Sequence, residues 1–320
     1  MIDCHHGSSA SRPLRAEQPT DDLKGMPTHA LLWRFALIAI CIVLLVLTIA
    51  VVVRNPETTE PPAVQNDTRT VKEYQFASAK ELERAERRGY DIVVVKGRPS
   101  AAELGELRDS HAEPLLVNYE QAFALNAEEA EFARSKGWLA ETCTGEEIHP
   151  ENIPGVTLLD ATIGDALVWR TDLIAGDTAG GAYGSTYLDT LRTFFPDGFY
   201  DGTPCGLSHE AWLQASMDTV ELVQQKTGKA VIANGSGLQN GRNYFDHKSE
   251  ADELMALADG VQIEHFLRSR NSMEQDLGFI GAINDAGKDA YVKCARARDA
   301  CREAFMQAPT WERNFLNIAR

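Results

Sequence analysis

Short apolar segments alternate with helical stretches from residue 71 onward, and this alternation constrains the fold more than any other feature. Helix signals separate the apolar segments, among them a capping-box pattern from Ser100 to Glu103 and glycine stops at Gly137 and Gly228. Repeated strand–helix units favour a parallel sheet, and eight strands favour an α/β fold closed as a TIM-type (β/α)8 barrel. The expected strands are 71–76, 91–96, 114–119, 138–142, 198–201, 230–234, 260–264 and 290–294.

The two ends of the barrel pattern are less regular than its middle. Little chain follows the eighth expected strand, so a truncated barrel, or one irregular at its C-terminus, is the alternative to regular closure. The stretch 143–196 lacks clear alternation and is expected to be a long insertion at the barrel rim. Such loops commonly build the substrate groove, and Trp169 there is a candidate for stacking on a sugar ring. Packing of that aromatic onto the barrel is the competing interpretation.

An uncharged run from Phe35 to Val53 precedes the barrel segment and is long enough to cross a bilayer as a helix. It has no adjoining cleavage site of small residues, so an uncleaved signal anchor is favoured over a cleaved signal peptide. Cations concentrate before the run, which predicts a cytoplasmic N-terminus and an extracytoplasmic barrel. The expected organisation is a disordered cytoplasmic tail (1–29), a transmembrane anchor (30–53), a proline-rich stalk (54–70) and the barrel domain (71–320).

Composition narrows the possible partners. The chain has 320 residues, 44% of them hydrophobic, and a formal net charge of −16, which argues against nucleic-acid binding. No cysteine or histidine spacing indicates a metal site, and nothing indicates an organic cofactor. An exported domain permits disulfides, and a bridge between Cys143 and Cys205 across the rim is expected. Cys294 and Cys301 could not pair if both lay on one straight helix.

Two segments carry the candidate chemistry. Gly198-Phe199-Tyr200-Asp201 and Gly260-Val261-Gln262-Ile263-Glu264 each follow an aspartate and each end in a carboxylate. At the C-terminal ends of parallel barrel strands, Asp201 and Glu264 would face the region where barrel active sites lie. Two carboxylates from different strands are what glycosidic bond cleavage requires. The competing interpretation is two ordinary Asp-Gly turns with carboxylates capping the following helices.

Together with Ala230-Val231-Ile232-Ala233-Asn234, these motifs resemble the glycoside hydrolases of the hypothetical glycosyl hydrolase 15-like group, which is similar to the endo-α-1,4-polygalactosaminidase family. The resemblance covers about residues 91–294. It implies a TIM-type barrel in which Asp201 and Glu264 are the catalytic pair. This chain departs from the family pattern in reading Gly202-Thr203 where the first motif usually continues with asparagine.

The functional hypothesis is therefore a membrane-anchored glycoside hydrolase that acts on a polysaccharide or oligosaccharide without cofactor or metal. Asp201 is assigned as nucleophile or base and Glu264 as general acid. Tyr119, Glu141, Asn234 and Trp169 are the candidate substrate-binding residues, and Glu141 is the main rival carboxylate. A catalytically inactive carbohydrate-binding or envelope-interaction protein on the same scaffold is the alternative.

Overall fold

A computed structural model describes residues 71–318, except for 110–112, 152, 181, 197, 269–271 and 295–297. The predicted tail, anchor and stalk lie outside the described residues. Among the described helices, none combines the length and apolar character needed to cross a membrane.

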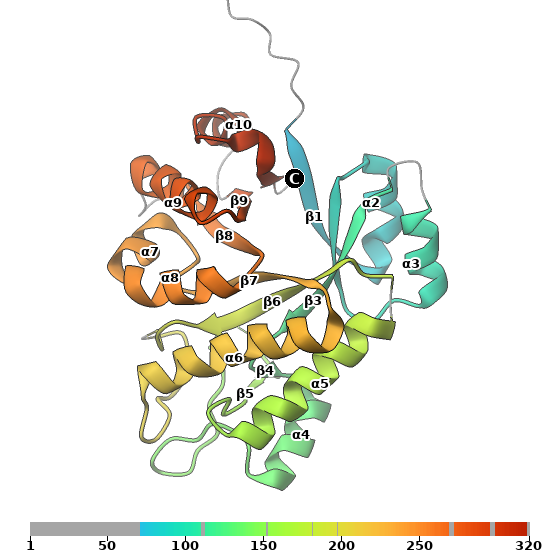
Figure 1. The fold of residues 1–320 in the computed structure, drawn as a ribbon. Helices are drawn as coiled ribbons and strands as arrows, with labels where there is room; N and C mark the ends of the chain where they lie inside the picture. Colours follow the sequence, from blue (N-terminus) through green and yellow to red (C-terminus); the bar gives the residue numbers. More distant parts are fainter. Residues whose placement is uncertain are drawn as a thin grey trace, which may run out of the picture. The chain divides into compact units, whose positions relative to one another are not determined.

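Eight parallel strands close into a barrel, which confirms the expected fold class (Figure 1). Their order around the barrel is β1-β10-β9-β8-β7-β6-β3-β2, so the last strand lies beside the first. The strands are β1 (Lys72–Ser78), β2 (Ile92–Lys96), β3 (Leu115–Gln121), β6 (Ser185–Arg192), β7 (Ala230–Ser236), β8 (Gly260–Phe266), β9 (Asp289–Cys294) and β10 (Phe315–Ile318).

Helices surround the barrel (Figure 1). Predicted helix boundaries hold where local signals are strong: the Ser100 side chain accepts a hydrogen bond from the amide of Glu103, and Gly137 and Gly228 adopt left-handed conformations as caps. The helical segments are η1 (Ala79–Glu81), α2 (Leu82–Arg88), α3 (Ala101–Arg108), α4 (Ala127–Lys136), α5 (Gly164–Gly180), α6 (His209–Thr227), α7 (Gly241–Asp246), α8 (Lys248–Leu257), α9 (Met273–Asp285), α10 (Arg298–Phe305) and η2 (Trp311–Arg313).

Two of the predicted barrel strands are wrong. Residues 138–142 form only isolated bridges, and in 198–201 only Tyr200 is bridged, to Pro150. Both segments belong to the rim connections that follow β3 and β6, where a two-stranded sheet, β4 (Ala124–Leu125) with β5 (Thr157–Leu158), is also found. The places of the two predicted strands in the barrel are taken by β6, from the supposed insertion, and by β10.

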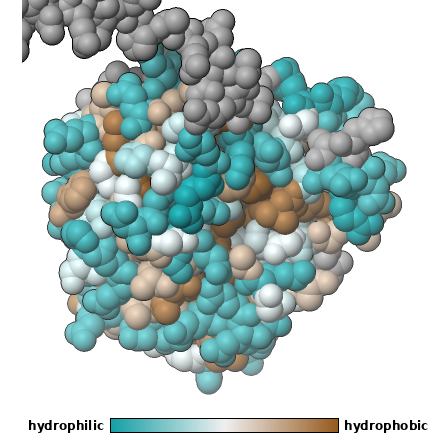
Figure 2. Space-filling view, turned by 45° about the horizontal axis from the view of Figure 1, so that its top comes forward, coloured by the Kyte–Doolittle hydropathy of each residue, from teal (hydrophilic) through white to brown (hydrophobic). Residues whose placement is uncertain are grey.

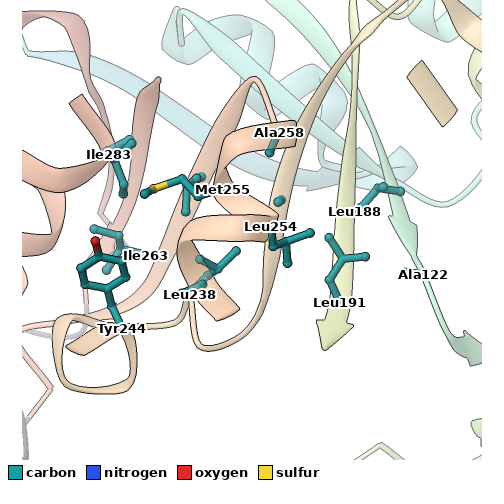
Figure 3. Packing of buried hydrophobic residues seen from close by; sticks show 14 of the residues in the cluster. Ala122, Leu188, Leu191, Leu238, Tyr244, Leu254, Met255, Ala258, Ile263 and Ile283 are labelled. Carbon is teal, nitrogen blue, oxygen red and sulfur yellow. The ribbon is translucent and has the colours of Figure 1, made fainter. Parts of the chain in front are cut away.

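Hydrophobic packing forms two layers because alternate strand residues face opposite sides. Inside the barrel lie rings and branched chains from six strands, including Tyr74, Val94, Tyr187, Ile232 and Tyr291. The opposite faces of the strands pack against the helices. Figure 3 shows this outer layer, in which Leu188 and Leu191 of β6 and Ile263 of β8 lie near Leu254 and Met255 of α8. The outward surface of the molecule is largely hydrophilic on the face drawn in Figure 2, with a hydrophobic patch set among polar residues.

The four cysteines among the described residues form two disulfides. The predicted Cys143–Cys205 disulfide is confirmed, with 4.5 Å between its Cα atoms, and it joins the rim connections after β3 and β6. Cys294 and Cys301 also pair. Their pairing is possible because Cys294 ends β9 whereas Cys301 lies on α10, so the two cysteines do not share one helix.

Candidate active site

Strand alternation places one long polar or aromatic side chain from each of seven strands at the C-terminal mouth of the barrel. Residues that are two apart on a strand share a face, so the residues that follow the buried interior positions also face inward. These inward residues, which we call the mouth cluster, are Phe76 on β1, Lys96 on β2, Tyr119 on β3, Asp189 on β6, Asn234 on β7, Glu264 on β8 and Lys293 on β9.

Asp189 is held by three donors. The Tyr119 hydroxyl donates to its Oδ2 at 2.6 Å, while the Asn234 Nδ2 at 2.9 Å and the Thr190 amide at 2.8 Å donate to its Oδ1. Thr190 has a left-handed backbone (φ 66°), and the register between β6 and β7 shifts between Leu188 and Leu191. The irregularity lets the Thr190 amide point back toward the carboxylate of Asp189, the residue before it. Bulges of this kind commonly re-aim side chains beside active sites.

Glu264 is bound differently, by a cation. The Lys293 Nζ lies 3.0 Å from its Oε1, and the Asn234 Nδ2 lies 3.5 Å from its Oε2. The side chains of Glu264 and Lys293 are 28% and 37% exposed, so this pair is reached from solvent. A single amide nitrogen, that of Asn234, thus contacts both carboxylates and fixes how far apart they lie.

The two carboxylates have opposite electrostatic environments. Burial raises the pKa of Asp189, and the negative charge of Glu264 raises it further, against the opposing hydrogen bonds and Lys96. Burial also acts to raise the pKa of Glu264, but the Lys293 ammonium outweighs it together with lesser contributions, and the pKa is lowered. In enzymes that use two carboxyl groups, the group with the higher pKa commonly serves as the acid and the group with the lower pKa is ionised.

Aromatic rings form the remaining wall of the mouth cluster. Tyr119 stacks on Tyr187 with centroids 5.4 Å apart, and Phe76 meets the same Tyr187 ring edge-on at 5.4 Å. The Lys96 Nζ lies over Phe76 at 4.8 Å and over Tyr119 at 4.5 Å. Lys96 is exposed as a residue, yet partial burial of its ammonium lowers its pKa.

The structure brings together three of the sequence-predicted site residues, Tyr119, Asn234 and Glu264. Trp169 lies elsewhere, on α5, where it stacks on Phe132 of α4 at 5.1 Å and approaches Trp138. Glu141 is exposed beside the Cys143–Cys205 disulfide, and its backbone carbonyl accepts a hydrogen bond from the amide of Cys205. The packing interpretation of Trp169 therefore describes its surroundings better than a place in the mouth cluster.

Asp201 is exposed in the connection between β6 and α6 rather than at the end of a barrel strand. Its Oδ1 accepts from the amide of His149 at 2.7 Å, and its own amide donates to the carbonyl of His149 at 3.0 Å. These bonds tie together the two rim connections that the disulfide also joins. The carboxylate position expected for Asp201 is occupied by Asp189.

Sequence reasoning missed Asp189, Lys96 and Lys293. The signal for Asp189 was present: Gly184 is followed by a β-branched and aromatic strand that ends in an aspartate, Ser185-Thr186-Tyr187-Leu188-Asp189. A Cβ at Gly184 would lie 2.3 Å from the Cδ1 of Leu115, the end of an exposed side chain on the neighbouring strand. Lys96 and Lys293 lie at or next to the ends of correctly predicted strands. Charged residues are common at strand ends, so the sequence did not indicate that these two lysines lie together at the barrel mouth.

Within the described ranges no three histidine, cysteine, aspartate or glutamate residues are grouped so that they could hold a metal ion. The chemistry available to the mouth cluster from its own side chains is proton transfer and nucleophilic attack by two carboxylates. An ammonium supports one of them and a phenol the other.

Comparison with known proteins leaves the family open. No protein-family model matches the chain, and no curated protein matches it. Similar solved structures include a cycloisomaltooligosaccharide glucanotransferase of Paenibacillus sp. (TM-score 0.49, 9% identity, covering 69% of this chain and 38% of that one). An α-galactosidase of Geobacillus stearothermophilus is also similar, with a TM-score of 0.47 and 8% identity, covering 75% of this chain and 36% of that one. An α-galactosidase of Thermus thermophilus has a TM-score of 0.42 and 12% identity, covering 73% of this chain and 60% of that one. The chain spans less than two fifths of the length of the first two.

Likeness at these scores carries no functional argument, so function must be argued from the residues of the mouth cluster. Fold and site together define this protein as a TIM-type barrel with a carboxylate pair at the C-terminal mouth.

Proposed function

We propose that this protein is a glycoside hydrolase whose catalytic pair is Asp189 and Glu264. The observation that carries the proposal is the shared contact of both carboxylates with the Asn234 amide, at the barrel end where active sites lie. Their pKa values are shifted in opposite directions, up for Asp189 and down for Glu264, which is the sense that an acid and an ionised partner require. The substrate is a polysaccharide or oligosaccharide.

The roles follow from the partners of each group. Glu264, beside the Lys293 ammonium, is assigned as the ionised carboxylate, and Asp189, whose pKa is raised by burial and by the Glu264 charge, as the proton donor. This reverses the role first expected for Glu264. Because one amide nitrogen lies 2.9 Å from Asp189 Oδ1 and 3.5 Å from Glu264 Oε2, we propose the retaining mechanism, whose carboxylates lie about 5–5.5 Å apart, over the inverting one, in which they lie about 6.5–9.5 Å apart.

In the proposed reaction a Glu264 oxygen bonds to the anomeric carbon while the glycosidic C–O bond breaks, and Asp189 gives its proton to the departing oxygen. Asp189 then removes a proton from water, whose oxygen displaces Glu264 from the sugar. Asn234 holds both carboxylates during this exchange. Its Oδ1 is buried and has no hydrogen-bond partner in the described structure.

The apolar run at 35–53 remains a predicted signal anchor, and we propose that it tethers this hydrolase to a membrane with the barrel outside the cytoplasm. Membrane fractions washed with alkaline carbonate provide the check. The full chain is expected to stay with the bilayer, whereas release into the wash would contradict the anchor.

Hydrolysis of a polysaccharide panel by the full chain, followed as release of reducing ends, tests the proposed activity. The panel includes galactosaminoglycans, neutral polymers and acidic polymers. The parent is expected to cleave at least one polymer, and Asp189→Asn and Glu264→Gln are each expected to lose about 100-fold or more in rate. Sugar binding without cleavage would instead support the carbohydrate-binding alternative. Undiminished activity in both variants would refute the assigned pair.

A further inference from the structure

The mouth cluster holds two ammonium groups, those of Lys96 and Lys293, and two carboxylates, those of Asp189 and Glu264. Lys293 is paired with Glu264 at 3.0 Å. Lys96 has no carboxylate within ion-pair distance among the residues described, and its ammonium rests instead on the rings of Phe76 and Tyr119. Of the two ammonium groups, Lys293 is in direct contact with a carboxylate, whereas Lys96 interacts with Asp189 only at longer range.

The proposed mechanism changes this balance of charge. When Asp189 holds its proton, the charges left in the mouth are those of Glu264, Lys293 and Lys96, and the sum is positive. An unpaired ammonium over aromatic rings is partly desolvated, which strengthens its interaction with any anion that reaches it. The chain as a whole carries a net charge of −16, so its overall field does not attract anionic polymers. A local cation is then the feature that could select them.

We propose that the active site takes an acidic glycan, with Lys96 forming an ion pair to an anionic group on the sugar bound at the barrel mouth. The chemistry recognised is a carboxylate of a uronic acid residue or a sulfate ester. The inference rests on the proposed function for the location of the sugar and for the proton on Asp189. It adds the substrate class and makes Lys96 a specificity-determining residue.

Position on the barrel supports this role for Lys96. It ends β2, next to β3 and its Tyr119, whose hydroxyl donates to Asp189, so the ammonium lies on the Asp189 side of the carboxylate pair. Exposure of Lys96 leaves its donors accessible from the mouth, whereas the ring contacts fix where the ammonium lies. A ligand anion there would contact Lys96 without displacing Lys293 from Glu264.

Binding rather than turnover tests the inference. Isothermal titration calorimetry on the full chain carrying Asp189→Asn, which prevents cleavage, would compare four oligosaccharide sets: uronic acid oligomers, sulfated galactans, neutral galactans and cationic chitosan oligomers. An anionic set is expected to bind about tenfold more tightly than the neutral set, as one charged hydrogen bond allows. The first two sets distinguish carboxylate from sulfate.

Lys96→Met, added to the same background, is expected to abolish that preference, and Lys96→Arg to retain it. Lys72→Met is the matched control, because Lys72 also lies over a ring, that of Phe315 at 5.2 Å, but at the start of β1. Preference for neutral or cationic oligomers, absence of binding by any anionic set, or a preference that survives Lys96→Met would overturn the inference. Cleavage of neutral polymers alone by the parent would uphold the hydrolase and contradict the acidic substrate.

Discussion

Asn234 links the two carboxylates of the mouth cluster at the scale of single residues. Its Nδ2 is 2.9 Å from Asp189 Oδ1 and 3.5 Å from Glu264 Oε2, and its position between β6 and β8 in the barrel makes both contacts possible. A carboxylate pair needs this support because two like charges in a partly buried site repel each other. Burial and the Glu264 charge raise the pKa of Asp189, whereas the Lys293 ammonium lowers the pKa of Glu264.

Lys293 sets the ionisation of Glu264, and this predicts a pH effect. Because the ammonium lowers the Glu264 pKa, Lys293→Met is expected to raise it. If Glu264 must be ionised to react, the acidic limb of the kcat/KM profile will move to higher pH while the basic limb stays in place. The measurement is the pH dependence of hydrolysis on one substrate of the panel, with Lys72→Met as control. Movement of the basic limb alone would make Glu264 the acid.

Strand β6 is the element that positions Asp189, and its irregularity depends on its neighbour β7. Gly235 follows Asn234 directly, and a Cβ at that position would lie 2.0 Å from the backbone oxygen of Leu191, just beyond the register shift. The neighbouring atom belongs to the backbone and cannot rotate away. Only glycine lets the two strands approach this closely.

Gly235→Ala is therefore expected to lower the free energy of unfolding by about 1–3 kcal/mol, as overpacking does in tight sites. Hydrolysis should fall too, because the strands that carry Asp189 and Asn234 must separate. Gly105→Ala in α3 is the matched control: no atom lies within 4 Å of its added Cβ, and alanine should stabilise the helix by about 0.5–1 kcal/mol. Urea unfolding curves measure the free energy of unfolding of both variants. Equal changes in Gly235→Ala and Gly105→Ala would contradict the role of the close approach between β6 and β7.

Sequence reasoning succeeded for elements with local signals and failed where register decided the result. Six of the eight barrel strands and the carboxylate Glu264 followed from apolar runs bounded by glycine and by helix caps. The segment predicted as an insertion contains β6, which was not recognised as a strand. Thr186, Asp189 and Thr190 interrupt its apolar pattern, and a bulge breaks the alternation of its side chains. Gly198 to Asp201 looked more like a barrel strand, yet it lies in a rim connection.

Closure of the barrel is a property of the whole molecule, and a short, weak strand completes it. β10 has only four residues, but it pairs with β9 on one side and β1 on the other. Asn317 Nδ2 also donates to the backbone oxygen of Tyr74 at 2.8 Å. No local pattern in so short a segment reveals such pairing, which is why an irregular C-terminus was the expected alternative. The segment becomes a strand because the edges of β9 and β1 are both open to pair with it.

The two disulfides make a whole-molecule prediction about stability. Cys143–Cys205 spans 62 residues of sequence and Cys294–Cys301 only seven. On the chain-entropy account, replacing both cysteines of the first pair by serine costs about 4 kcal/mol, roughly 2 kcal/mol more than the same change in the second pair. Thermal unfolding of the two double variants checks the difference, and a larger loss from the second pair would contradict it.

The central claim is that the barrel strand aspartate, Asp189, and not the rim aspartate, Asp201, works with Glu264. The most direct measurement compares the hydrolysis rates of Asp189→Asn and Asp201→Asn on the same polymer, with folding verified by circular dichroism. We predict that Asp189→Asn loses about 100-fold or more, whereas Asp201→Asn stays close to the parent rate. The opposite order, with Asp201→Asn folded but inactive and Asp189→Asn active, would contradict the account.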